Sequence, residues 1–418
     1  MSLEVIIVGA GIAGLCTAIA LREAGHSVFE KSQFLGEAGA ALLLSPNGAR
    51  VLSHLNFSFT NAQANEMTCW EVLNGMTFEV IEQSHLHNAE EVYGAKIFTV
   101  HRSDLHNEFI RLALQKVDGE KDIELFLGSG VKSADTEKGV VELQNGDRHK
   151  ADLIIGADGI HSVVKGAVVG QAVEPRFSGV NAFRFLIPTS MLEEDEKYME
   201  MLKVKGKGSS IFVDVSETEV GRHLVWYDCH SGAVQNFVGI HKGSTESPAE
   251  TEISGLKARM MVEFEHFHPN IAHIISVAPE VTDWPLYIHE PLPTWNRGKV
   301  LLIGDAAHPM LPFGGQGANQ AIEDAGALGA LLSHMSSVED LPKRLALFDK
   351  VRRLRASRVQ ILSTVRLGRE KDVEDEVRKY TDYPGQSVPT TFHERNVHDL
   401  GFDVYEQCRM LCRNETEM

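Results

Sequence analysis

Three glycine-rich turns carry the residues whose types and spacing could bind a nucleotide. The first spans residues 9–14 (GAGIAG) and lies between an apolar run and a stretch with helical periodicity. Gly9 permits a tight turn, Gly11 lets the backbone approach a pyrophosphate, and Gly14 allows a helix to pack closely on a sheet. Glu30 stands where a carboxylate can accept hydrogen bonds from a ribose. Together these features predict a dinucleotide-binding βαβ unit, without deciding between NAD and FAD.

Two further turns follow buried, strand-like runs later in the chain. They contain Asp158 in GADGIHS and Asp305 in GDAAHP, and both carboxylates suit ribose or ribityl hydroxyls. In an open α/β sheet, ligands bind beyond the carboxyl ends of the strands, so all three turns can meet at one cofactor. The glycine-rich residues 310–319 then lead into a helix whose N-terminus can stabilise negative charge on a reduced flavin ring. The set of three turns therefore favours FAD.

In these motifs the chain resembles the single-component class A flavoprotein monooxygenases, specifically the salicylate hydroxylase-like branch common in fungal aromatic and polyketide metabolism. The resemblance rests on GAGIAG, HRSDL, GADGIHS and GDAAHPMLPFGGQGANQAIEDA, and runs from residue 5 to about residue 363. It implies a para-hydroxybenzoate hydroxylase-like fold, non-covalent FAD, and NADH or NADPH as co-substrate. The implied reaction is O2-dependent hydroxylation of a small phenolic or salicylate-like substrate through a flavin C4a-hydroperoxide. The alternatives are an epoxidase or oxidative dearomatase of an alkaloid, polyketide or terpenoid, and a non-catalytic FAD-fold protein.

The resemblance also implies which residues hold FAD. Arg102, in HRSDL, can reach the pyrophosphate with a permanently charged fork, and Val131 is similar in placement to a residue that packs near adenine. One position departs from the family pattern: the second motif usually closes on arginine, whereas Lys165 stands here and lacks the bidentate geometry proposed to help recognise NAD(P)H. The full expected set is Gly9, Gly11, Ala13, Gly14, Glu30, Gly39, Ala41, Arg102, Val131, Asp158, Asp305, Pro312, Gly315, Gly317 and Ala318.

Arg184 and Tyr227 are the candidate catalytic residues on the substrate side. Arg184 lies between two phenylalanines in a strand-like run, where a buried guanidinium would need an anionic partner. The related tropolone- and sorbicillinol-forming enzymes have an arginine that looks equivalent and holds a phenolate or carboxylate. Tyr227 could hydrogen-bond a substrate oxygen. The alternatives are an arginine that extends to solvent and a tyrosine that only packs.

Two other clusters of ionisable residues have ordinary structural explanations. The first has spacing that could suit a metal, but a proline interrupts it and companion ligands are not evident, so we predict no metal site. Its members are Glu265, His266, His268 and His273. The second is a basic run in an amphipathic helix, which predicts a solvated face that could alternatively attract the phosphates of NAD(P)H. This run consists of Arg352, Arg353, Arg355 and Arg358.

The pattern of apolar runs and turns predicts an α/β protein made of four segments. Residues 1–175 and 286–370 form the two parts of a Rossmann-like FAD-binding domain. Residues 176–285 form an inserted, mainly antiparallel β substrate domain, and residues 371–418 form a helical C-terminal extension. Near the start, residues 12–24 are expected to be helical, with Gly25 as the C-cap.

Composition and charge narrow the range of partners. A net charge of -18 disfavours nucleic acid and anionic membrane surfaces, and no uninterrupted apolar run approaches the ~20 residues of a membrane span. A strand that begins at Glu4 leaves no room for a signal peptide, and five scattered cysteines fit a reducing compartment. We therefore expect a cytoplasmic monomer or homodimer whose partners are a small aromatic substrate, O2 and NAD(P)H.

Overall fold

A six-stranded, mainly parallel sheet is built from the most apolar runs of the sequence. The computed structural model describes residues 3–22, 25–33, 40–117, 122–206, 208–216, 221–243, 253–333, 335 and 337–416. The strands of this sheet lie in the order β18-β19-β12-β1-β2-β8. The central strand β1 (Glu4–Val8) pairs in parallel with β2 (Gly25–Phe29) and β12 (Leu153–Gly156). The remaining strands are β8 (Ile123–Phe126), β19 (Val300–Leu302) and the antiparallel edge strand β18 (Asn296–Arg297).

Helices α1 (Ile12–Ala20), α4 (Arg102–Leu114) and α9 (Gly317–Leu332) pack beside this sheet, and α1 contacts both of the others. The expected end of α1 at Gly25 is wrong, because Gly25 is the first residue of β2. The chain leaves the helix earlier, and Arg22 then donates to the carbonyl of Gln115 at 2.5 Å, beyond the end of α4. A small sheet of β9 (Val131–Asp135), β10 (Val140–Leu143) and β11 (Arg148–Lys150), followed by α5 (Lys165–Val169), completes what we call the α/β lobe.

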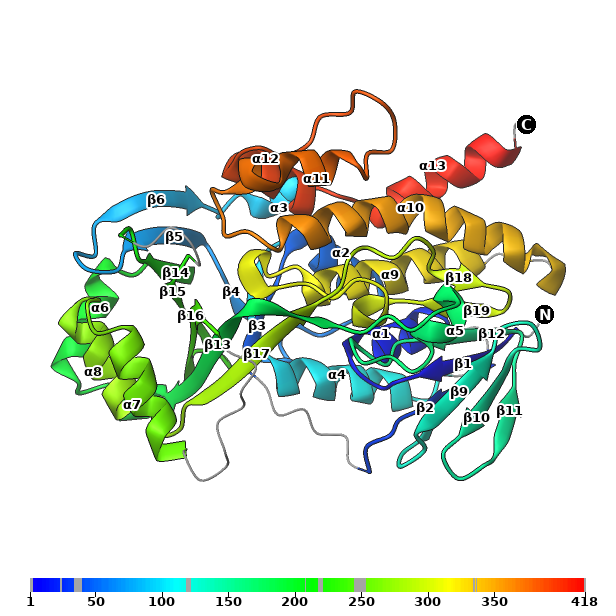
Figure 1. Ribbon diagram of the computed structural model, residues 1–418, viewed down its shortest axis with the longest axis horizontal. Helices are drawn as coiled ribbons and strands as arrows, with labels where there is room; N and C mark the ends of the chain where they lie inside the picture. The colour runs from blue at the N-terminus through cyan, green and yellow to red at the C-terminus, as the bar shows by residue number, and fades with distance from the viewer. Residues whose placement is uncertain are drawn as a thin grey trace.

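A seven-stranded sheet forms the second lobe, which we call the β lobe (Figure 1), in the order β17-β13-β16-β15-β14-β5-β6. Its strands are β5 (Cys69–Asn74), β6 (Val80–His85), β13 (Arg176–Pro188), β14 (Gly208–Val213), β15 (His223–Cys229), β16 (Val234–Lys242) and β17 (Thr282–Ile288). Helices α6 (Glu196–Val204), α7 (Ile253–Glu263) and α8 (Pro269–Val277) share a buried apolar cluster with it. The sheet reaches beyond the expected segment 176–285, because β5 joins it from much earlier in the chain through a parallel pairing with β14.

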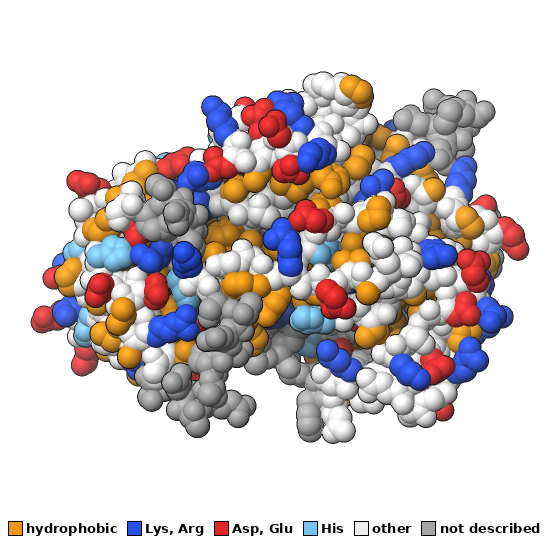
Figure 2. Space-filling view, in the orientation of Figure 1, with side chains coloured by type: hydrophobic (Ala, Val, Ile, Leu, Met, Phe, Trp, Pro, Cys, Tyr) orange, Lys and Arg blue, Asp and Glu red, His pale blue; other side chains and the backbone are white. Residues whose placement is uncertain are grey.

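A third, small sheet joins the lobes and leads into the helices that follow it. It contains β3 (Ala41–Leu44), β4 (Asn65–Glu66) and β7 (Phe98–His101), and β3 runs into α2 (Pro46–His54), while α3 (Ala89–Tyr93) precedes β7. Four helices follow α9 in the chain, and Figure 1 shows them together along one side of the molecule. They are the long α10 (Leu341–Leu362), α11 (Glu374–Arg378), α12 (Phe392–Leu400) and α13 (Val404–Thr416). None of the described helices is long and apolar enough to cross a membrane. On the face drawn in Figure 2, hydrophobic side chains gather near the middle, and charged ones are interspersed toward both ends.

Candidate active site

A cavity of about 420 Å³ lies between the two lobes, and parts of all three glycine turns line it. The first turn contributes Gly11 and Ala13, and the second contributes Gly159. The third contributes Asp305, and the helix start after it contributes residues 315–318. The carboxyl ends of β1, β12 and β19 therefore bring together the motifs that lie about 150 residues apart in the sequence, as the sheet argument predicts.

The first turn needs glycine for reasons that the backbone makes explicit. Gly9 has a φ of +104°, and a Cβ on it would stand 2.5 Å from the carbonyl oxygen of Ala157 in the second turn. A Cβ on Gly14 would overlap the carbonyl oxygen of Gly9. Gly11 is the N-cap of α1 and makes no side-chain cap hydrogen bond. The N-H groups of the first helical turn therefore point out of the helix end that lies at the cavity.

Glu30 braces this turn through the protein backbone. Its carboxylate accepts hydrogen bonds from the N-H of Ala10 at 2.8 Å and from the N-H of Ser32 at 2.9 Å. Val131, the first residue of β9, is buried in the core of the α/β lobe. Gly39 lies outside the described residues, whereas Ala41 lines the cavity.

The second turn is organised around its own carboxylate. Asp158 accepts hydrogen bonds from the N-H groups of Val163 (2.8 Å) and Val164 (3.4 Å), and burial raises its pKa. Lys165, the residue that departs from the family pattern, is 2% exposed and donates from Nζ to the carbonyl of Ile160 at 2.9 Å. Burial lowers the pKa of Lys165, while Asp158 opposes that change. Both side chains thus stabilise the loop from within.

The third turn leaves room for a flat ring. Pro312–Gly314 forms a short 3-10 turn, and Gly315 adopts the left-handed conformation with φ +63°. A Cβ on Gly317 would meet no other atom closer than the Cβ of Met310 at 4.0 Å, so the space beside this glycine is open. The N-terminus of α9 has no side-chain cap. Open space and uncapped N-H groups fit the pyrimidine edge of a flavin, which carries oxygen acceptors and, when reduced, negative charge.

The wall contributed by the β lobe is mainly apolar and holds one well-placed cation. Residues of β5, β14, β15 and β16 line it, including Trp70, Ile211, Val225 and Val238. Arg184, opposite Val238 in the β13–β16 ladder, also lines the cavity, and its Nε is buried without a hydrogen-bond partner among the described residues. Burial lowers the pKa of Arg184, and the nearby charge of Arg102 lowers it further, although the guanidinium remains protonated.

Tyr227 lies at the cavity but gives its hydroxyl to the backbone. Its OH donates to the carbonyl of Ala41 at 2.7 Å, and Asn236 Oδ1 accepts from the N-H of the same residue at 3.1 Å. Burial raises the pKa of Tyr227, so the hydroxyl stays neutral. Side chains of the β lobe therefore hydrogen-bond both the N-H and the carbonyl of Ala41 in β3.

A family model described as an FAD binding domain matches residues 2–362. The chain belongs to this family. FAD-dependent monooxygenase cfoG of Aspergillus candidus is 33% identical over 424 residues, which cover 97% of this chain and 94% of that protein. 3-Amino-4-hydroxybenzoate 2-monooxygenase of Streptomyces cremeus is 34% identical over 340 residues, covering 78% of this chain and 77% of that protein. A solved salicylate hydroxylase substrate complex matches with a TM-score of 0.73 at 23% identity, covering 98% of both chains.

The protein is therefore an FAD-dependent monooxygenase, and the predicted fold and the use of FAD are confirmed. The residues that line the cavity fit the parts of FAD as follows. The turn at Gly11 and the helix start behind it suit the pyrophosphate, with Arg102, the first residue of α4, on the same wall. The open backbone at Gly317 and Ala318 suits the flavin ring, and the exposed Asp305 also lines the cavity.

The cavity residues that were not found from the sequence include Trp70, His223 and Arg366. His223 Nδ1 donates to the carbonyl of Gly221 at 2.5 Å, which leaves Nε2 as an acceptor. Burial lowers the pKa of His223 to about 4, and Arg366 adds to this, so the ring is neutral near pH 7. Each of the three lies on a strand or loop that reaches the site only through long-range packing, and none belongs to a local motif.

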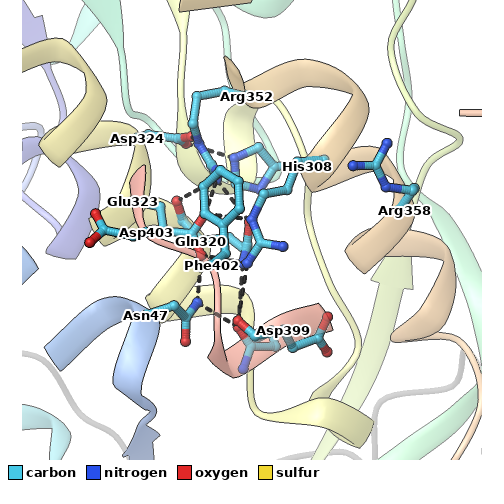
Figure 3. Close-up of polar contacts among 12 residues, drawn as sticks. Asn47, His308, Gln320, Glu323, Asp324, Arg352, Arg358, Asp399, Phe402 and Asp403 are labelled. Carbon is cyan, nitrogen blue, oxygen red and sulfur yellow. Dashed lines mark hydrogen bonds and ion pairs between the residues drawn. The ribbon is translucent and has the colours of Figure 1, made fainter. Parts of the chain in front are cut away.

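The prediction of a solvated face for the arginine run is wrong for three of its four members. Arg352 is 0% exposed, and Arg355 and Arg358 are also buried. Arg352 and Arg355 pack against the acidic side of α9, whereas Arg358 pairs with Asp382 at 3.0 Å and donates to the carbonyl of Tyr380. Figure 3 shows Arg352 pointing toward Glu323 and Asp324, while Arg358 lies apart from them. Arg352 binds Asp324 at 2.9 Å and Glu323, and Arg355 binds Glu323 at 2.8 Å. Arg353 alone keeps a surface position, paired with Asp349.

This ionic cluster supports the flavin end of the cavity from behind. Asp324 accepts hydrogen bonds from the N-H of Gly304 at 2.9 Å and from Nε2 of His308 at 2.7 Å, both in the third turn. Burial alone would raise the pKa of Asp324, but His308 and Arg352 lower it overall. The third turn is thus anchored to α9 by a carboxylate that stays charged.

The histidines whose spacing could suit a metal have separate partners. His266 bonds Asp214 at 2.7 Å, His273 bonds Asp195 at 2.6 Å, and His268 caps α8 by accepting from the N-H of Asn270. Among the described residues, no group of three or more metal-type ligands converges.

Proposed function

We propose that this monooxygenase hydroxylates a small anionic aromatic compound, a phenol or a salicylate-like acid, with NADH or NADPH as the electron donor. Bound FAD supplies the activation of O2, and the protein supplies orientation and a cavity from which water is excluded. The observation that carries the proposal is Arg184, a buried cation on an otherwise largely apolar wall of the cavity.

Arg184 has a physical reason to bind an anion. A buried N-H group without an acceptor costs about 1–3 kcal/mol, and the Nε of Arg184 is such a group among the described residues. A phenolate or carboxylate oxygen would satisfy it and would offset the charge that burial disfavours. The aromatic ring of the same molecule would then lie against side chains such as Trp70, Val225 and Val238.

The relatives support an anionic aromatic substrate by the compounds in their names. 3-Amino-4-hydroxybenzoate and salicylate are both phenols that carry a carboxylate. Tyr227 and the neutral His223 add polar atoms on the same wall, and we assign Tyr227 to positioning Ala41 and the adjacent substrate surface through its hydroxyl. This assignment replaces direct donation to the substrate, because the hydroxyl proton is already used.

The test is a screen of phenolic acids, simple phenols and indoles for stimulated NADH or NADPH oxidation, followed by the mass and absorbance of the product. A gain of one oxygen atom with the aromatic absorbance retained supports hydroxylation. The same gain with loss of aromatic absorbance indicates dearomatisation, and a substrate confined to isolated alkenes indicates epoxidation. Either of these results would replace the proposed reaction.

The role of Arg184 is tested with the substrate so identified. Arg184→Ala should lower product formation by on the order of a hundredfold, the scale of about 3 kcal/mol of charged hydrogen bonding, while FAD content stays nearly normal. Arg184→Lys should recover only part of the loss, because a point charge cannot reproduce a planar fork. Arg176→Ala is the matched control, since Arg176 lies on the same strand but is exposed and paired with Glu290 at 2.8 Å. Equal turnover in Arg184→Ala and Arg176→Ala would refute the assignment.

A further inference from the structure

The chain beyond residue 362, where the family match ends, forms part of the back of the cavity. Leu367 lines the cavity directly. Phe392, at the start of α12, packs edge-on against Trp70 of the cavity wall, with ring centroids 5.8 Å apart and an interplanar angle of 89°. Leu367, Phe392 and Trp70 belong to one apolar cluster, so α12 is held against the outside of the active site.

Arg395 lies one helical turn after Phe392 and is 1% exposed. Its Nη1 donates to the carbonyl of Val365 at 3.2 Å and lies 3.5 Å from Glu370, and its Nε lies 3.6 Å from Asp399. Its Nη2 is buried and has no hydrogen-bond partner within the part of the chain that the structure describes. Nη2 lies beside Gly314, because a Cβ added to Gly314 would stand only 2.4 Å from this nitrogen.

Gly314 belongs to the turn that lies along the flavin end of the cavity. Its neighbours Phe313 and Gly315 line the cavity, and Gly315 is fixed from the other side by Asn319. The side-chain nitrogen of Asn319 donates to the carbonyl of Gly315 at 2.8 Å and to the carbonyl of Leu43 at 2.9 Å. The turn is therefore hydrogen-bonded by an amide on α9 and packed against a guanidinium on α12.

We propose that Arg395 is a positioning residue that sets where the 312–315 turn, and with it the flavin ring, lies. It touches neither cofactor nor substrate and acts through Gly314. Glycine is required at position 314 because the guanidinium occupies the place of a side chain. Carboxylates and a carbonyl hold the guanidinium from behind, so it cannot retreat without losing those partners. A displaced turn would misplace the ring, and misplacement by about 1 Å can cost a hundredfold in rate.

The experiment is a double-mutant cycle between Gly314→Ala and Arg395→Lys. Gly314→Ala adds one methyl group against Nη2 and should weaken FAD binding by about tenfold to a hundredfold, the usual range for overpacking a rigid site. Arg395→Lys keeps the charge but removes Nη2, so the combined variant should bind FAD more tightly than Gly314→Ala alone. FAD affinity is measured by fluorescence titration of the apoprotein, together with the visible spectrum of the bound flavin.

The control is Arg358→Lys, which alters another buried arginine of the same region, bound to the carbonyl of Tyr380 and to Asp382. It should leave the flavin spectrum unchanged. If Arg395→Lys does not accumulate as folded protein, Arg395→Gln takes its place, since it also ends short of Gly314. Unchanged FAD affinity and spectrum in Gly314→Ala, or losses that simply add in the combined variant, would overturn the proposal. Both readouts depend on FAD alone, so they stand whichever substrate the enzyme takes.

Discussion

Replacing Arg352 with methionine removes the central cation of the cluster between α9 and α10 and keeps a side chain of similar length. Arg352 is fully buried and bonds Glu323, Asp324 and the side-chain oxygen of Gln320. After the change, Asp324 keeps His308 and Glu323 keeps Arg355, but both fully buried carboxylates lose their shared partner. Breaking a buried pair in this way costs about 3–5 kcal/mol in the free energy of unfolding.

The neighbouring residue offers a matched comparison on the same helix. Arg353 bonds Asp349 one turn away, and these side chains are 24% and 30% exposed. Such a surface pair contributes about 0.3–0.5 kcal/mol. With roughly 2.1 cal/mol/K of unfolding entropy per residue over 418 residues, Arg352→Met should lower Tm by about 3–6 °C, and Arg353→Met by less than about 1 °C.

Thermal unfolding of the apoprotein, followed by circular dichroism at several scan rates, measures both values without a contribution from FAD binding. Gly304 and His308 bind Asp324, so the holoprotein of Arg352→Met should also lose FAD more readily. Equal Tm values for the two variants would show that the cluster adds nothing to stability, and the reasoning from burial would fail.

Two further outcomes follow from the same site. Asp305→Ala should lower FAD occupancy, read as the ratio of flavin to protein absorbance in purified protein, because it removes a carboxylate that lines the cofactor cavity. Full retention of flavin would mean that Asp305 has no part in binding. Burial would raise the pKa values of Glu323 and Asp324, but the neighbouring cations lower both overall. The two carboxylates therefore contribute stability above about pH 4, and this stability is lost as the pH falls through their lowered folded-state pKa values. Arg352→Met should therefore unfold at a higher pH than the parent protein in an acid titration, and coincident titrations would contradict this.

The glycine turns could be predicted because their requirements are local. Gly9 needs a positive φ and Gly14 needs the absence of a Cβ, and both needs are visible in the spacing within a single βαβ unit. Arg184 could be proposed because a permanent charge between two phenylalanines is unusual on a strand. The arginine run could not be judged in this way, because periodicity shows that a helix has a basic face without showing what packs on it. The partners of Arg352 lie on α9, in another segment of the chain.

The same limit explains the part of the β lobe that the sequence did not indicate. β5 pairs with β14 across more than a hundred residues, so the strand that carries Trp70 has no local sign of belonging to the substrate wall. His223 also has an ordinary strand context, and its orientation depends on the carbonyl of Gly221. Long-range pairing decides which of several similar strands faces the cavity, and one sequence does not contain that information.

The contacts of β3 join the β lobe to the helix on the other wall of the cavity. Tyr227 and Asn236 of the β lobe hold the carbonyl and the N-H of Ala41, and two residues later the carbonyl of Leu43 is held by Asn319 of the flavin-side helix. The position of β3 therefore depends on the β lobe and on α9 together, because both supply hydrogen bonds to its backbone within three residues.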